Sequence, residues 1–206
     1  MSRRTEIEKS PIMPFSTITV EANRDQKTLL HNSAIVSQIE SFGTHFAKSI
    51  TLDENGLPPV FIYLAKGAKP MARVLSDSLN ENRTEQDLSF HPVKYTFYDG
   101  TTRMDKPRRI DKRKYRYPDV VGRRVILIDD VHDTGETVAQ AIQDARDAGA
   151  TVSDCIFLLE KPGVDEGRII RTAQWAEGVN KHVLFNIPNV WVEGFGLDTN
   201  ERGRRN

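Results

Sequence analysis

The sequence has little cysteine, no long apolar run and no excess of charge of either sign. Cys155 is the one cysteine in the chain, so no internal disulfide can form, and its apolar neighbours indicate a small core residue rather than a reactive thiol. No segment approaches the roughly 18 apolar residues that a membrane-spanning helix needs, and no apolar stretch of signal-peptide length follows the N-terminal residues. We therefore expect a cytoplasmic protein that has no membrane partner.

The charges of the whole chain cancel. Lysine plus arginine and aspartate plus glutamate both number 29 in a chain of 206 residues, which gives the protein as a whole no electrostatic attraction to nucleic acid. Hydrophobic residues make up 38% and charged residues 28%, the composition of a globular protein. Any preference for a charged ligand must therefore come from local groups of charge.

Strand-like and helix-like apolar patterns alternate along the chain. Amphipathic spacing predicts helices over residues 33–48, 71–79 and 137–148. Short runs of β-forming residues predict strands over residues 17–20, 60–65, 92–98, 125–128 and 151–159. Strand, helix and strand in succession imply parallel pairing with right-handed crossovers. The sequence therefore predicts an α/β fold with a central, mostly parallel sheet flanked by helices.

The two ends of the chain differ from this core. Residues 1–27 are polar and indicate a loose arm, and the last forty or so residues hold short strand-like pieces, among them 183–185, and turns. We expect a single domain over residues 1–206. Its core spans about residues 28–160, and a small C-terminal hood spans about residues 161–206 together with part of the N-terminal arm.

A basic segment interrupts the pattern. Residues 99–118 hold a run of arginines and lysines, two prolines and almost nothing to bury, which predicts a long mobile loop. A nucleic-acid-binding protein would use such a stretch. However, the stretch from Arg103 to Arg116 holds no aromatic residue except Tyr115, and a solvated lid explains it equally well. We do not expect nucleic acid to be the partner.

The segment Val125–Thr137 combines groups that suit opposite charges. An apolar strand ends in Asp129 and Asp130, and Asp133–Thr137 opens the next helix. The N-terminus of a helix offers free N–H groups and a positive dipole end to a phosphate, and Gly135 lets the backbone approach it. The two acids repel phosphate, but they can accept hydrogen bonds from sugar hydroxyls or help hold Mg²⁺. An acidic strand end with an ordinary helix cap would explain only part of this string.

This string resembles the signature with which type I phosphoribosyltransferases bind phosphoribosyl pyrophosphate (PRPP). The signature is an apolar strand, two acids, two variable residues and then Asp/Thr-Thr-Gly-x-Thr. The resemblance implies that Asp129 and Asp130 contact the ribose hydroxyls and help hold Mg²⁺, and that the turn cradles the 5′-phosphate. Asp133 matches the acid near purine N7, which would handle the proton there. The PRPP-binding residues implied in this loop are Asp129, Asp130, Asp133, Thr134, Gly135, Glu136 and Thr137.

Two more segments resemble the hypoxanthine-guanine branch of that family. Leu64-Ala65-Lys66-Gly67-Ala68 is similar to its pyrophosphate loop, in which a Lys-Gly pair follows a cis peptide. The resemblance implies a cis bond between Ala65 and Lys66, with Lys66 and Gly67 on the pyrophosphate. Leu158–Lys161 matches a strand that ends in a lysine, and Lys161 would donate a hydrogen bond to the 6-oxo group of the base.

The C-terminal segment Ile187–Glu201 resembles Ile-Pro-Asp-x-Phe-Val-Val-Gly-Tyr-Gly-Leu-Asp-Tyr-x-Glu of the same branch. Trp191 falls at the aromatic residue that stacks on the purine, and the backbone of Val192 would read the edge of the base. Asp198 would lie at the base-binding end of the site and hold a second Mg²⁺ on the pyrophosphate. Arg204 matches the pyrophosphate-binding arginine.

The resemblance covers about residues 30–206, although Ala68 replaces a second glycine and Asp165 stands where an arginine is common. It implies Mg-dependent transfer of the phosphoribosyl group from PRPP to N9 of a 6-oxopurine, in purine salvage, by a homo-oligomer (a dimer or tetramer). Tyr98 matches the tyrosine that closes over the reacting centre, and the basic segment after it would be the mobile lid. The catalytic residues implied are Lys66, Tyr98, Asp133 and Arg204.

Three alternatives stay open at this point. The base could be xanthine or a pyrimidine, although the Ile-Pro…Gly-Leu-Asp segment argues against pyrimidines. The chain could be a regulator that keeps the PRPP fold and binds nucleic acid through its basic segment. It could also bind PRPP without turnover, but the four aspartates of the proposed site argue against that.

Overall fold

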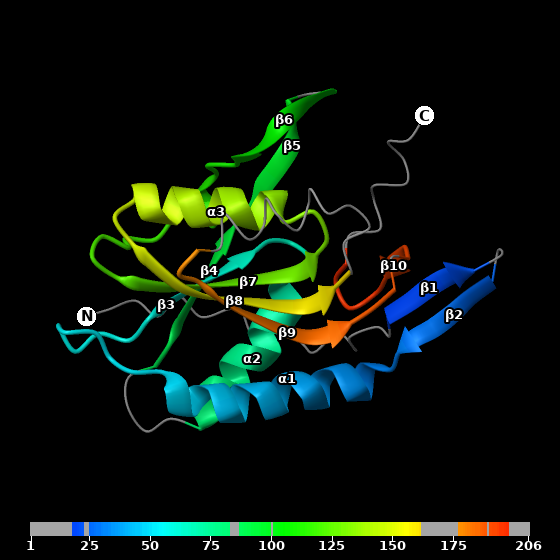
Figure 1. The fold of residues 1–206 in the computed structure, drawn as a ribbon, viewed down its shortest axis with the longest axis horizontal. Helices are drawn as coiled ribbons and strands as arrows, with labels where there is room; N and C mark the ends of the chain where they lie inside the picture. The colour runs from blue at the N-terminus through cyan, green and yellow to red at the C-terminus, as the bar shows by residue number, and fades with distance from the viewer. Residues whose placement is uncertain are drawn as a thin grey trace.

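A five-stranded parallel sheet forms the centre of the computed structural model, which describes residues 18–22, 25–82, 87–99, 101–161, 177–188 and 190–197. Its strand order is β4-β3-β7-β8-β9, and every neighbouring pair is parallel (Figure 1). These strands are β3 (Val60–Leu64), β4 (Ser89–Val93), β7 (Arg124–His132), β8 (Thr151–Glu160) and β9 (Asn180–Asn186). The predicted α/β fold is confirmed.

Helices cover both faces of the sheet. Figure 1 shows α3 on one face, with α1 and α2 on the other. The helices are α1 (Asn32–Phe46), which the 3-10 helix η1 (Ala47–Ser49) continues, α2 (Lys69–Glu81) and α3 (Glu136–Asp147). Side chains of β7 alternate between two apolar clusters, so Ile126 and Ile128 pack with α1 and α2 while Val125 and Leu127 pack with α3. Because both faces are covered, these strands are apolar along their length rather than in alternation.

Two small antiparallel sheets complete the fold. One has the order β10-β1-β2, where β1 is Ile18–Ala22, β2 is Asp25–Leu30 and β10 is Val192–Glu193. It joins the N-terminal arm to the C-terminal segment, and in Figure 1 it lies on the side toward which β8 and β9 point. The other sheet is a hairpin of β5 (Tyr95–Asp99) and β6 (Thr102–Arg109), which the 3-10 helix η2 (Arg113–Tyr115) follows.

The basic segment differs from its prediction. Residues 99–118 contain most of a hairpin and a 3-10 turn rather than an open loop. The physical reason is that the segment is anchored by aromatic residues. Tyr115 is 8% exposed, and the hydroxyl of Tyr95, at the start of β5, donates to Asp144 of α3 at 2.9 Å. The single strand predicted over residues 92–98 is divided between β4 and β5. β4 tolerates Pro92 because it is an edge strand of the central sheet.

Three further differences concern strands of the central sheet. β7 runs through His132, so Asp129 and Asp130 belong to the strand rather than to a loop after it. β8 continues beside it, since His132 pairs with Glu160. Residues 183–185, expected in the C-terminal hood, lie in β9 at the edge of the central sheet.

Cys155 and the helices agree with the composition. Cys155 is 4% exposed in the cluster under α3, and burial raises the pKa of its thiol to about 12. It is therefore a core residue, as expected. Among the described helices, none has both the length and the apolar character needed to cross a bilayer.

Candidate functional site

A tight turn connects the carboxyl end of β7 to α3. Gly135 is the N-cap of α3 and has φ 74° and ψ 0°, a left-handed conformation that glycine adopts without steric cost. The hydroxyl of Thr134 accepts a hydrogen bond from the backbone N–H of Glu136 at 3.4 Å. Glu136 and Thr137 form the first turn of the helix, and Asp133 is exposed beside it. The positive dipole end of such a helix start suits a phosphate.

Asp129 and Asp130 are adjacent and only partly exposed at the end of β7. The backbone N–H of Asp130 donates to Oδ1 of Asp129 at 3.0 Å. Burial raises the pKa of Asp129 well above its usual value, and the neighbouring Asp130 carboxyl raises it further, while this backbone hydrogen bond opposes the shift. A divalent cation or two sugar hydroxyls would stabilise the pair, because both favour carboxylates that otherwise repel each other.

The acid pair fits a Mg²⁺ ion that shares its shell with a substrate. Within the described ranges, no group of three or more His, Cys, Asp or Glu side chains is close enough to hold a metal alone. Mg²⁺ usually takes one or two carboxylates and completes its coordination with water and substrate phosphate oxygens. Two carboxylates at the carboxyl end of β7 therefore suit the Mg²⁺ ion that the sequence analysis expected.

The Lys66-Gly67 loop lies against this acid pair. The peptide bond between Ala65 and Lys66 is cis, as the resemblance implied, and Lys66 is exposed at the carboxyl end of β3. A Cβ atom placed on Gly67 would lie closer than 3.0 Å to all three atoms of the Asp130 carboxyl group. Only a residue without a side chain allows the two segments to come this close, so the Lys66-Gly67 loop packs directly against the acid pair.

The C-terminal segment meets the same loop. A Cβ atom on Gly196 would touch Cγ of Pro70 and lie 3.2 Å from the carbonyl oxygen of Gly67. Val192 is 7% exposed in β10, whereas Trp191 is only partly buried. Three segments that are far apart in the sequence therefore meet at the carboxyl ends of β3 and β7.

Lys161 follows β8 and is held between its neighbours. Its backbone N–H donates to the carbonyl oxygen of His132 at 3.1 Å. The backbone N–H of Ile187, just after β9, donates to the carbonyl oxygen of Glu160 at 2.9 Å. The predicted base-binding lysine is thus tied through the backbone to the end of β7 and to the start of the predicted base-binding segment.

His132 is a residue that the sequence analysis missed. It is 6% exposed, and its Nδ1 lies 2.9 Å from Oε1 of Glu160, which also accepts a hydrogen bond from Nζ of Lys181. Its ring packs on Phe157 with centroids 4.6 Å apart. Burial lowers the pKa of His132, although the hydrogen bond to Glu160 opposes that shift. The available signal was a histidine next to Asp133, directly after the acid pair and Val131.

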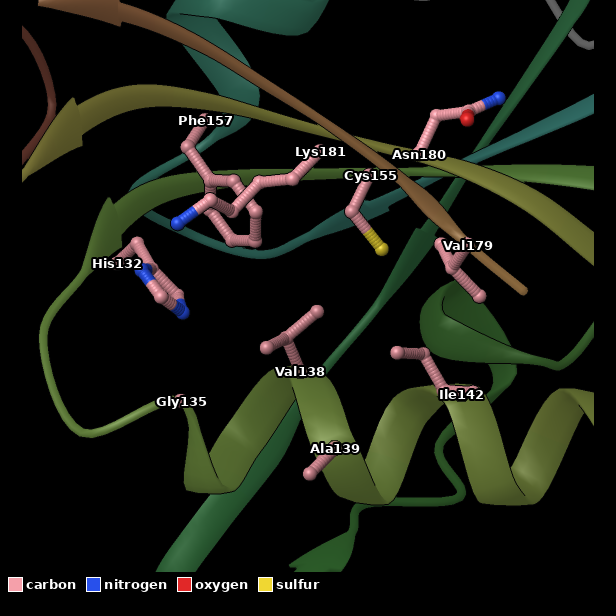
Figure 2. Close-up of a pocket in the computed structure, with 10 residues that line it drawn as sticks. All are labelled: His132, Gly135, Val138, Ala139, Ile142, Cys155, Phe157, Val179, Asn180 and Lys181. Atoms are coloured by element: carbon pink, nitrogen blue, oxygen red, sulfur yellow. The ribbon is translucent and has the colours of Figure 1, made fainter. Parts of the chain in front are cut away.

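A small cavity lies beneath the turn, between α3 and the sheet. Figure 2 shows His132 and Lys181 at one end of it, with apolar side chains of α3 and β8 around the rest. Its space for a water-sized molecule is about 20 Å³, enough for a single water molecule and far too little for a nucleotide. Its lining residues are His132, Gly135, Val138, Ala139, Ile142, Cys155, Phe157, Val179, Asn180 and Lys181. The cavity is therefore too small to be the ligand site.

Three predicted site residues are not placed at the carboxyl ends of β3 and β7. Tyr98 lies on β5, in the hairpin, which is a sheet separate from the central one. Asp198 and Arg204 lie outside the described residues. The roles of these three residues stay predictions, as do the roles of the other candidate site residues.

Known proteins are similar to this chain over most of its length. The model of the phosphoribosyl transferase domain family matches residues 26–199. The hypoxanthine-guanine phosphoribosyltransferase of Streptococcus pneumoniae is 26% identical over 182 residues, which cover 88% of this chain and 90% of that protein. The bifunctional protein TilS/HprT of Listeria monocytogenes is 28% identical over 182 residues, 88% of this chain and 25% of that protein.

Solved structures show the same fold. A hypoxanthine phosphoribosyltransferase from Staphylococcus aureus has a TM-score of 0.62 at 20% identity, with 87% of this chain and 88% of that chain covered. The hypoxanthine phosphoribosyltransferase from Trypanosoma cruzi, in complex with the product IMP, has a TM-score of 0.58 at 22% identity, with 81% and 83% covered.

Proposed function

Because this chain belongs to the phosphoribosyl transferase domain family, we propose that it transfers the phosphoribosyl group of PRPP to N9 of hypoxanthine or guanine in purine salvage. The observation that carries the proposal is the close approach of Gly67 to the Asp130 carboxyl group. It joins a surface suited to pyrophosphate to a surface suited to a ribose diol. The phosphate-binding turn at Gly135 then follows within a few residues. Relatives that match nearly the full chain carry the same activity in their names.

The proposed reaction separates charge. The ribose becomes positive in the transition state and the leaving pyrophosphate becomes negative, so the site must stabilise both. Lys66 is exposed beside Gly67 and would place its ammonium group on the pyrophosphate. Asp129 and Asp130 would accept hydrogen bonds from the ribose hydroxyls. Mg²⁺, held by these two acids and substrate oxygens, would neutralise the pyrophosphate when it is bound.

The base would bind at the C-terminal segment. Trp191 would stack on the purine, the backbone of Val192 would read its edge, and Lys161 would donate to the 6-oxo group. A cation at that edge favours a carbonyl oxygen over an amino group, which favours hypoxanthine and guanine over adenine. Asp133 would take part in proton transfer at N7. Tyr98 and the hairpin would close over the site and exclude water.

The direct test supplies PRPP, Mg²⁺ and one base at a time and measures nucleotide and pyrophosphate. We expect nucleoside monophosphate from hypoxanthine and guanine and none from uracil or orotate. Product from a pyrimidine alone would contradict the proposed base class, and no product from any base would contradict the reaction.

A variant tests the role of Asp133. Asp133→Asn removes the carboxylate that would handle the N7 proton, so we expect turnover to fall about 10²-fold or more with little loss of PRPP binding. Steady-state kinetics together with PRPP titration would measure both quantities. Unchanged turnover in this variant would refute the assignment.

Transfer to xanthine and binding of nucleic acid are alternatives to the proposed function. Some basic side chains that would attract a nucleic acid instead form ion pairs within the protein. Arg109 pairs with Asp144 at 3.6 Å and stacks on Tyr117, with 4.7 Å from its guanidinium carbon to the ring centroid, and Arg108 pairs with Asp99 at 3.3 Å. A mobility-shift assay at several salt concentrations would detect such binding. The cytoplasmic location and the homo-oligomer stay predictions.

A further inference from the structure

Glu193 lies beside Trp191 in the segment proposed to bind the base. The indole Nε1 of Trp191 donates to Oε1 of Glu193 at 3.1 Å, and both residues are partly buried. The hypoxanthine-guanine string quoted above has phenylalanine and valine at these two positions, so the donor and the acceptor occur together in this chain. A phenylalanine has no N–H to donate, so this hydrogen bond can form only when the aromatic residue is tryptophan.

The backbone around Glu193 is fixed on both sides. Glu193 pairs with Thr19 of β1 in the antiparallel β10-β1-β2 sheet. After it, Phe195 is 1% exposed, and the backbone N–H of Leu197 donates to the carbonyl oxygen of Gly194 at 2.9 Å. The carboxylate is therefore presented to the indole ring from a fixed strand.

We propose that Glu193 is a positioning residue, which fixes the plane of the Trp191 indole so that the ring face meets the purine. The inference rests on the proposed function, because it takes Trp191 as the stacking platform. The second side-chain torsion of tryptophan has broad energy wells, so a directional contact helps to define the ring plane. A hydrogen bond from Nε1 to a charged acceptor selects one orientation. Stacking then orders the base without first having to order the ring.

The test uses the full chain and a double-mutant cycle. Glu193→Gln keeps a carbonyl oxygen as acceptor, and we expect every kinetic constant to stay within about twofold of the starting protein. Glu193→Val removes the acceptor, and we expect KM for the base to rise about tenfold while KM for PRPP stays within about twofold. In a Trp191→Phe background, Glu193→Val should change KM for the base by less than about twofold, since the donor is already gone.

Fluorescence gives an independent readout. Trp175→Phe leaves Trp191 as the single tryptophan of the chain. In that background, Glu193→Val should shift the emission maximum and reduce the anisotropy of Trp191 in the unliganded protein, and Glu193→Gln should not. This measurement needs no catalysis, so it separates a failure of this inference from a failure of the proposed reaction.

Two results would overturn the inference. One is a rise in KM for the base upon Glu193→Val that is equally large in the starting protein and in the Trp191→Phe background, which would show that Glu193 acts on the fold of the segment. The other is unchanged KM and unchanged anisotropy in Glu193→Val. If the starting protein turns over no base at all, the proposed function fails, and the anisotropy alone decides whether Glu193 holds the ring.

Discussion

Gly67→Ala should disable the site while leaving the fold intact. An added Cβ atom would lie closer than 3.0 Å to all three atoms of the Asp130 carboxyl group, a separation that real Cβ atoms essentially never show. The carboxyl group would have to move by about 1 Å, and a displacement of that size in a catalytic arrangement can lower the rate about 10²-fold. We therefore expect kcat/KM for PRPP to fall about 100-fold. Steady-state kinetics with varied PRPP would measure the effect.

A matched control separates this contact from a general effect of replacing a glycine. Gly56 lies in a turn with φ +70°, and a Cβ atom there would meet nothing within 4 Å. Gly56→Ala should lower stability by about 1 kcal/mol through its left-handed backbone and leave kcat/KM unchanged. If Gly67→Ala and Gly56→Ala had the same kinetics, the close approach of Gly67 to the Asp130 carboxyl group would not be needed for activity, and the reasoning would be refuted.

The remaining predictions concern the hydrogen-bonded carboxylates Glu160 and Asp154. His132→Ala and Glu160→Ala should show a coupling energy of about 1–2 kcal/mol in urea unfolding, because the two side chains are hydrogen bonded at 2.9 Å. Additive effects would contradict that contact. Burial raises the pKa of Asp154, but hydrogen bonds from His182 at 2.8 Å and from Asn180 at 3.2 Å lower it, and its pKa is lowered overall. A lowered folded-state pKa stabilises the protein at pH above the unfolded pKa near 3.9, and this stabilisation is lost as pH falls through the folded pKa. The loss of stability below about pH 4 should therefore be smaller in Asp154→Asn than in the starting protein. Equal pH profiles of unfolding would contradict this.

The main elements of the fold could be predicted because each has a local pattern. The run Val125–Ile128 has apolar residues without alternation, which indicates a strand buried on both faces, and β7 is covered by helices on both sides. The hairpin at residues 95–109 could not be predicted in this way. Its basic side chains are typical of solvent, and its anchors are a hydroxyl at Tyr95 and a carboxylate at Asp144, which lie 49 positions apart. A contact over that distance leaves no local signal.

The chemical groups of the candidate site could be named from the sequence, but the contacts that support them could not. The acids, the Lys-Gly pair and Gly135 are recognised by their spacing, and the cis bond before Lys66 is confirmed. His132 stands at a position that varies in the signature. Its hydrogen bond to Glu160 depends on the register in which β7 pairs with β8, and register follows from the packing of the whole sheet.

The close approach of Gly67 to Asp130 also depends on the sheet, in this case on the order of its strands. β3 is followed in sequence by β4, which lies on one side of it, whereas β7, β8 and β9 extend in order on the other side. The direction of winding therefore reverses between β3 and β7, and open parallel sheets bind ligands beyond the carboxyl ends of strands at that reversal. Tyr63 of β3 pairs with Ile128 of β7, so the residues that follow both strands meet at this point. No local pattern encodes strand order, which is why the sequence could name both loops without showing that they touch.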